Sequence, residues 1–173
     1  MKLKFFLISR LILLFLIITL LTIAILIFNT KTITLEKITN VDKETILKYL
    51  EMKTENISLT HEGSTMVSAF HILEVTPNKI YIWVLKSEYV KYRNEILYLM
   101  GATSLPVVLY IKKINGKLEI INHKFPRDGT YWSRDVNRLF PTTVIKSFNN
   151  IDKESLQNMI NDRARNLLSN MSQ

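Results

Sequence analysis

The stretch PVVLYIKKINGKLEIINHK, residues 106–124, decides the fold of this chain. Residues 106–114 and 117–124 are rich in the β-branched and apolar residues that are typical of strands. Asn115 and Gly116 lie between them, and both residue types tolerate the positive φ angles of a type I′ hairpin turn. The sequence therefore predicts an antiparallel hairpin with Asn115 and Gly116 as its structural turn.

A second hairpin is predicted before the first. Residues 66–75 and 79–90 are rich in aromatic and β-branched residues, and Pro77 between them suits a type I turn. Residues 79–90 are apolar on both faces, which predicts a central strand covered on both sides. We therefore expect a four-stranded antiparallel meander. Residues 89–101, between the two hairpins, are expected to be a connector of packed aromatic residues rather than a ligand-facing loop.

Helices are predicted on both sides of the meander in sequence. Residues 41–53 carry apolar side chains at helical spacing, with Asn40 or Asp42 as the N-cap. Residues 131–140 and 142–149 are predicted to be short helices, and 153–169 a longer one capped by Asp152. The predicted class is α+β: an N-terminal transmembrane helix, a short helix, the meander, and C-terminal helices packed on the sheet.

The N-terminal part has the pattern of a membrane anchor. Residues 11–28, LILLFLIITLLTIAILIF, are 18 positions without a charge, which would span about 27 Å as a helix at roughly 1.5 Å per residue. Residues 1–10 carry three cations, which predicts a cytoplasmic N-terminus. The run is long and ends in bulky residues, so we expect an uncleaved signal-anchor; a cleaved signal peptide is the alternative. We expect residues 29–40 to be a connector and residues 41–173 an extracytoplasmic domain.

The net charge of +8 indicates an anionic partner. Residues 79–124 hold eight Lys and Arg against three Glu, and Lys112, Lys113 and Lys117 flank the predicted turn. Outside a cell the available polyanions are lipid headgroups and wall polymers rather than nucleic acid. The three lysines are therefore anion-binding candidates. The alternative is that they protect an exposed sheet edge from pairing with other chains.

Residues 125–141 allow two interpretations. In the functional one, Arg127, Arg134 and Arg138 form an anion-binding cluster with Tyr131 and Trp132 at its rim. In the structural one, which we favour, this segment is a strand-to-helix corner. Asp128 would then bond backbone amides, Gly129 would supply a positive φ angle, and the aromatic residues would pack on the sheet.

The sequence favours a non-enzymatic protein. The chain has no Cys, only four Gly, and no motif of a nucleotide-binding loop, a nucleophile elbow or a metal site, so we expect no cofactor and no metal. We predict a binding or accessory module of the cell envelope whose partners are the bilayer and an envelope polyanion or a membrane protein. The alternative is a small ligand sensor or hydrolase that uses the concave sheet face, with His71, His123, Asp128 and Tyr131 as its candidate residues.

Two segments also carry a family resemblance. Residues 101–108, GATSLPVV, together with PRDGTY at 126–131, Asp135 and LFP at 139–141, resemble an uncharacterised extracytoplasmic domain of low-GC Gram-positive bacteria. That domain occurs behind a membrane anchor or attached to membrane sensor proteins, and the resemblance covers residues 66–148. It implies a location and a type of fold, but no ligand and no functional residues.

Overall fold

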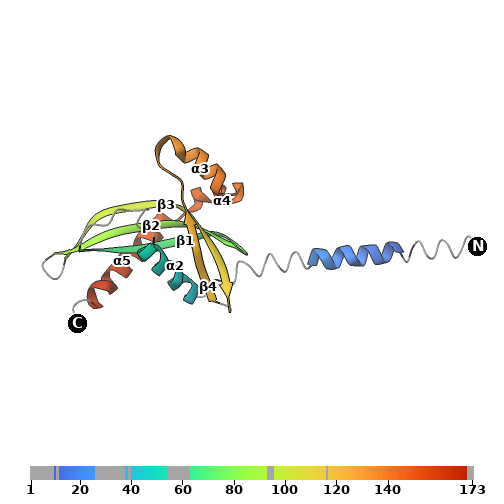
Figure 1. Ribbon diagram of the computed structural model, residues 1–173, viewed down its shortest axis with the longest axis horizontal. Coiled ribbons are helices and arrows are strands. Elements are labelled where there is room, and N and C mark those ends of the chain that lie inside the picture. The colour runs from blue at the N-terminus through green and yellow to red at the C-terminus, as the bar shows by residue number, and fades with distance from the viewer. Residues whose placement is uncertain are drawn as a thin grey trace, which may run out of the picture. The chain divides into compact units, whose positions relative to one another are not determined.

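A computed structural model describes residues 10, 12–25, 38, 40–53, 63–92, 96–115 and 117–170. The chain divides into two compact units, the first ending at Lys37 and the second beginning at Ile38. In the first unit residues 12–25 form a helix (Figure 1). Leu11 and residues 26–28 of the predicted anchor lie outside the described residues. Within the described ranges, no helix combines the length and the apolar character needed to cross a membrane.

The second unit contains the predicted four-stranded antiparallel meander, in the spatial order β1-β2-β3-β4 (Figure 1). The strands are β1 (Ser64–Thr76), β2 (Lys79–Tyr92), β3 (Ile96–Ile114) and β4 (Lys117–Lys124). Asn115 has a φ of 53° at the turn between β3 and β4, as the predicted hairpin requires. Gly116 lies outside the described residues. Each strand therefore pairs with its neighbour in sequence, and β1 and β4 form the two edges.

The connector predicted for residues 89–101 is wrong. β2 continues to Tyr92 and β3 already begins at Ile96, so most of this segment is a longer hairpin. The register shifts between Glu88, which pairs with Gly101, and Tyr89, which pairs with Leu99, so that Met100 is an extra residue in β3. Gly101 and the bulge interrupt the alternation of side chains, which explains why the sequence pattern conceals this part of the strand.

The predicted helices are all present in the second unit. They are α2 (Asn40–Lys53), α3 (Trp132–Leu139), α4 (Thr142–Ser147) and α5 (Lys153–Asn170), with 3₁₀ turns η2 (Gly129–Tyr131) before α3 and η3 (Phe148–Asn150) after α4. Asp152 accepts a hydrogen bond from the Ser155 backbone N–H at 2.9 Å, which confirms it as the N-cap of α5. Asp42 lies within the first turn of α2, so it does not precede the helix as an N-cap does.

The helices cover opposite faces of the sheet. Ile80, Ile82 and Val84 of β2 pack with Ile46 and Leu50 of α2 in one core cluster. On the other face, residues of α5 pack on β1 and β2, and residues of α3 and α4 pack around Tyr81 and Val108. β2 is thus buried on both sides, as its two apolar faces predict.

Candidate functional site

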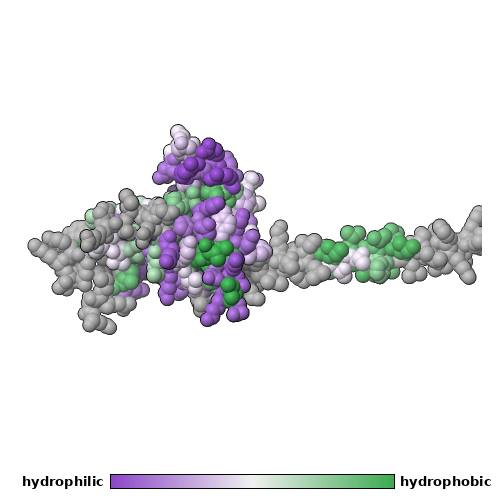
Figure 2. Space-filling view, viewed as in Figure 1, coloured by the Kyte–Doolittle hydropathy of each residue, from purple (hydrophilic) through white to green (hydrophobic). Residues whose placement is uncertain are grey.

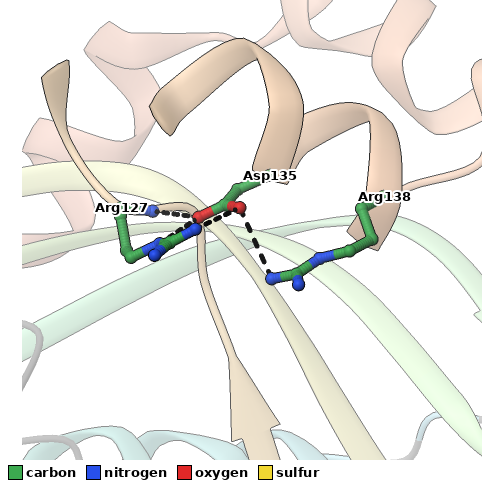
Figure 3. Close-up of polar contacts among 3 residues, drawn as sticks. All are labelled: Arg127, Asp135 and Arg138. Carbon is green, nitrogen blue, oxygen red and sulfur yellow. Dashed lines mark hydrogen bonds and ion pairs between the residues drawn. The ribbon is translucent and has the colours of Figure 1, made fainter. Parts of the chain in front are cut away.

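Three of the predicted anion-binding residues lie just after β4: Arg127 in the segment that leads to α3, and Arg134 and Arg138 on α3. Arg127 donates from Nε to Oδ2 of Asp135 at 2.6 Å and from Nη2 to Oδ1 at 2.9 Å, and its backbone N–H donates to the same carboxylate at 3.2 Å. Arg138 approaches Asp135 from the other side, with Nη2 at 3.4 Å from Oδ1 (Figure 3). The Asp135 side chain is only 2% exposed, whereas those of Arg127 and Arg138 are 53% and 68% exposed. A buried carboxylate therefore holds two exposed cations.

Tyr131 holds the remaining arginine of this cluster. The guanidinium carbon of Arg127 lies 4.3 Å from the centre of the Tyr131 ring, and that of Arg134 lies 5.2 Å from it. Both distances allow a cation–π contact. Arg127 is therefore committed to Asp135 and Tyr131, while Arg134 and Arg138 keep donors that face solvent. Figure 2 shows hydrophilic residues gathered over α3.

The predicted structural role of Asp128 is wrong in its detail. Asp128 makes no side-chain capping bond at η2, and the residue that bonds the corner is Asp135. Gly129 has a φ of 67°, a conformation that favours glycine, as the turn predicts. Trp132 packs against apolar residues on both faces of the sheet rather than forming an exposed rim. A carboxylate does bond the corner as predicted, but it is that of Asp135, eight residues after Arg127.

The charge states of this pair are fixed by their contact. Hydrogen bonding from Arg127 is the main cause that holds the pKa of Asp135 well below its ordinary value, with the charge of Arg138 adding to it. The same bond raises the pKa of Arg127 further above its ordinary value. Asp135 is therefore ionised throughout the physiological range and is unsuited to proton transfer near neutral pH.

The predicted lysines lie apart from the arginines. Lys112, Lys113 and Lys117 are exposed at the β3–β4 turn, and the arginine cluster follows the opposite end of β4. β4 has eight residues, which corresponds to roughly 27 Å at about 3.4 Å per residue. The six anion-binding candidates thus form two separate basic surfaces: a lysine tip (Lys112, Lys113, Lys117) and an arginine corner (Arg127, Arg134, Arg138).

The two histidines of the enzyme alternative lie on opposite edge strands of the sheet. His71 is exposed on β1 at one edge of the sheet, and His123 lies on β4 at the other. Asp128 and Tyr131 lie between β4 and α3, next to the arginine corner. His123 instead shares a 2.9 Å hydrogen bond between its Nδ1 and the Tyr49 hydroxyl, and it stacks on Phe125 with ring centres 6.0 Å apart. In the described part of the chain, no group of three or more His, Cys, Asp or Glu could hold a metal ion.

Sequence reasoning missed two buried charges on the α2 face of the sheet. Lys86 and Glu88 continue the apolar row of Ile80, Ile82 and Val84, and they are 1% and 2% exposed. Ser64 donates its hydroxyl to Glu88 Oε1 at 2.5 Å. The signal that could have found them is the abrupt change from apolar to charged residues along one face of a strand predicted to be central.

Sequence reasoning also missed a groove along the outer edge of β1. It has a volume of about 520 Å³ and lies between α2 and α5, with residues 69–72 of β1 at its base. A strand edge and helix surfaces that are remote in sequence form it, so no local motif marks it.

Comparisons of the chain with protein-family models, with curated proteins and with solved structures found no match.

Proposed function

We propose that the chain is a single-pass membrane protein whose α+β domain lies on the extracytoplasmic side and binds an anionic polymer of the cell envelope, without enzymatic activity. The observation that carries this proposal is the apolar run at residues 11–28, together with exposed cations on the domain that follows it. The resemblance of residues 66–148 to an extracytoplasmic domain behind a membrane anchor supports the same location.

The described part of the apolar run supports an anchor in its chemistry. The large apolar side chains of residues 12–25 are 52–71% exposed on all sides of their helix. The two threonines of that segment bond back to the helix itself: Thr19 donates to the Leu16 carbonyl at 2.9 Å, and Thr22 to the Thr19 carbonyl at 2.8 Å. A helix that is apolar all round, with its hydroxyls satisfied internally, suits a lipid environment.

Two exposed basic surfaces support a polyanion as the ligand. The lysine tip presents three cations, and the arginine corner presents Arg134 and Arg138 in addition to the pair that Arg127 makes with Asp135. Two cationic surfaces separated by the length of β4 match a long polymer with repeated charges better than a small anion. The placement of His71 and His123 on opposite edge strands supports a binding role over catalysis.

Topology is tested by protease treatment of protoplasts. We expect the part beyond residue 30 to be degraded without lysis and the protein to resist extraction from membranes at alkaline pH. Replacing Ile18→Arg and Leu21→Arg together should prevent stable insertion, because each central Arg costs about 3 kcal/mol on insertion scales. The control Ile18→Val with Leu21→Ile should insert normally. Full protection of the domain in intact protoplasts would contradict the proposed topology.

Polyanion binding is tested with poly(glycerol phosphate) and the full chain in nanodiscs of neutral lipid. Binding should weaken steeply between about 50 and about 300 mM salt. Replacing Lys112, Lys113 and Lys117 by Gln should weaken it about tenfold or more, given roughly 1 kcal/mol per cation at an anionic surface. The matched control replaces three exposed lysines of α2, Lys43, Lys48 and Lys53, by Gln, and should have a much smaller effect. Equal effects of both triple variants would reduce the result to net charge and contradict a specific surface.

A further inference from the structure

The groove on the β1 edge is built from two helices and a strand edge. Leu47 and Lys43 of α2 form one wall, Met159 and Arg163 of α5 form the other, and residues 69–72 of β1 form the base. The helices lie on opposite faces of the sheet, so the groove exposes the edge of β1 between them. Its volume of about 520 Å³ is within the range of about 300 to 1,000 Å³ that is usual for ligand sites.

The backbone of β1 points hydrogen-bonding groups into this groove. The backbone N–H of Ser68 donates to Glu51 Oε1 of α2 at 3.0 Å, so it points away from β2. In an antiparallel pair, every second residue turns both its N–H and its C=O away from the partner strand. Phe70 and Ile72, which pair with Val84 and Ile82, follow Ser68 in this alternation. Their N–H and C=O groups therefore face the groove.

One end of the groove is closed by an ion pair. Nη2 of Arg163 lies 2.9 Å from Glu51 Oε1, the same oxygen that accepts from the Ser68 N–H, and Nη1 lies 3.7 Å from Glu44. This contact joins α5 to α2 across the edge of β1 at Ser68. The Glu51 carboxylate thus accepts from the outward amide of Ser68. Within the described residues no hydrogen bond to the outward groups of Phe70 and Ile72 is present.

We infer that the groove binds an extended peptide segment of a partner protein, which adds to β1 as a further strand. Only an extended backbone offers donors and acceptors at the spacing of Phe70 and Ile72. Leu47, Phe70 and Met159 provide apolar contacts for its side chains. Around the groove Lys43 and Arg163 face the carboxylates of Glu44, Glu51 and Asp162, a net charge of −1, which favours a segment without acidic residues. A second copy of the chain fits less well, because its own β1 lies between the same two helices.

The test uses the full chain in nanodiscs and a capped peptide of alternating threonine and valine. We expect hydrogen exchange at the Phe70 and Ile72 amides to be fast without the peptide and to slow when it binds. An analogue with the same side chains but N-methylated backbone amides should bind about tenfold more weakly or not at all, because it loses two or more hydrogen bonds. This comparison requires no change in the protein.

Variants of Ile72 provide a second test. Ile72→Pro removes an outward N–H, which an edge strand tolerates, and should abolish binding, whereas Ile72→Ala keeps the N–H and should retain most of it. The Gln variant of the lysine tip should bind the peptide normally, which separates this proposal from polyanion binding. Equal binding of the N-methylated peptide, or amides of Phe70 and Ile72 that are already protected without peptide, would overturn the proposal. Protection that appears only on dimerisation would assign the groove to a second copy and would also overturn it.

Discussion

Two arginine–carboxylate pairs hold the domain together at different places, and they differ in the sequence distance that they span. Arg127 and Asp135 are eight residues apart and fix the corner between β4 and α3. Arg163 and Glu51 are 112 residues apart and join α5 to α2 across β1. The first pair is completed by a backbone N–H of its own loop, and the second by the N–H of Ser68 in a strand.

The Arg127–Asp135 pair is thus a local contact, whereas the Arg163–Glu51 pair, called the clasp below, is a long-range contact. The Asp135 carboxylate receives three hydrogen bonds from Arg127 and is almost fully buried, so its loss leaves a cation and an amide without their acceptor. Glu51 is also mostly buried, but it connects two helices that already pack on the sheet through apolar residues. We therefore expect the corner to depend on its ion pair more strongly than the groove does.

The largest loss of stability is expected for Asp135→Ala. The melting temperature of the full chain in detergent should fall by several degrees, because Arg127 and its backbone N–H lose their acceptor. The pKa of Asp135 is lowered in the folded state, so its contribution is complete above the ordinary value of 3.8 and is lost as the pH falls below it. The variant should therefore lose part of the acid sensitivity of the wild type.

Asp128→Ala is the matched control for this corner. Asp128 is exposed and makes no capping bond at η2, so the substitution should leave the melting temperature nearly unchanged. If Asp128→Ala were as damaging as Asp135→Ala, the corner would depend on the turn and not on the buried carboxylate.

A smaller effect is expected at the clasp. Glu51→Ala should lower the free energy of unfolding by about 1.5 to 3 kcal/mol, as for hydrogen bonds to charged groups, and Glu51→Gln should cost less because its amide oxygen still accepts from Ser68. Urea denaturation of both variants provides the measurement. Asp162→Ala is the control: it breaks an exposed pair with Arg165 at 3.4 Å and should cost less than about 1 kcal/mol. A Glu51→Ala variant as stable as this control would show that the clasp contributes nothing measurable.

The smallest expected change in stability concerns His123 on β4, which contacts Tyr49 of α2. Burial lowers the pKa of His123 below its ordinary value of 6.5, with the charge of Lys86 adding to this. The unfolded chain then binds more protons than the folded one, so stability should decrease as the pH falls through 6.5. Urea midpoints at about pH 7.5 and about pH 5.5 test this. His123→Phe should reduce the difference, and His71→Gln, at an exposed position, should retain it.

The sequence predicted the elements that depend on local chemistry. The hairpin turn at Asn115, the cap at Asp152 and the two apolar faces of β2 each reflect a rule that acts within a few residues. The structure contains the positive φ of Asn115, the cap at Asp152 and a β2 strand that is buried on both faces. The first half of β3 escaped prediction because the Met100 bulge and Gly101 break the period of two. The alternation of side chains in the sequence therefore predicts a strand where the pairing register is regular, and it fails where the register shifts at a bulge.

The candidate sites were harder to predict than the fold. The segment from Arg127 to Arg138 was identified, but the role given to Asp128 belongs to Asp135, because hydrogen-bond geometry and not residue type decides between two nearby carboxylates. The clasp between Glu51 and Arg163 and the groove beside it could not be predicted, since they depend on how two distant helices cross one strand. The buried Lys86 and Glu88 were in the sequence as a visible break in an apolar row.

The order of the strands also has a consequence for how the chain is made. Each strand of the meander pairs with the one synthesised just before it, so the sheet can assemble through short loop closures as the chain emerges. α5 follows all four strands in the described part of the chain, and until it docks, β1 lacks one wall of its groove and the Glu51–Arg163 contact. During synthesis the exposed edge of β1 can therefore pair with the strands of neighbouring chains. Truncation before α5 should therefore leave the edge of β1 uncovered on one side and increase aggregation of the chain.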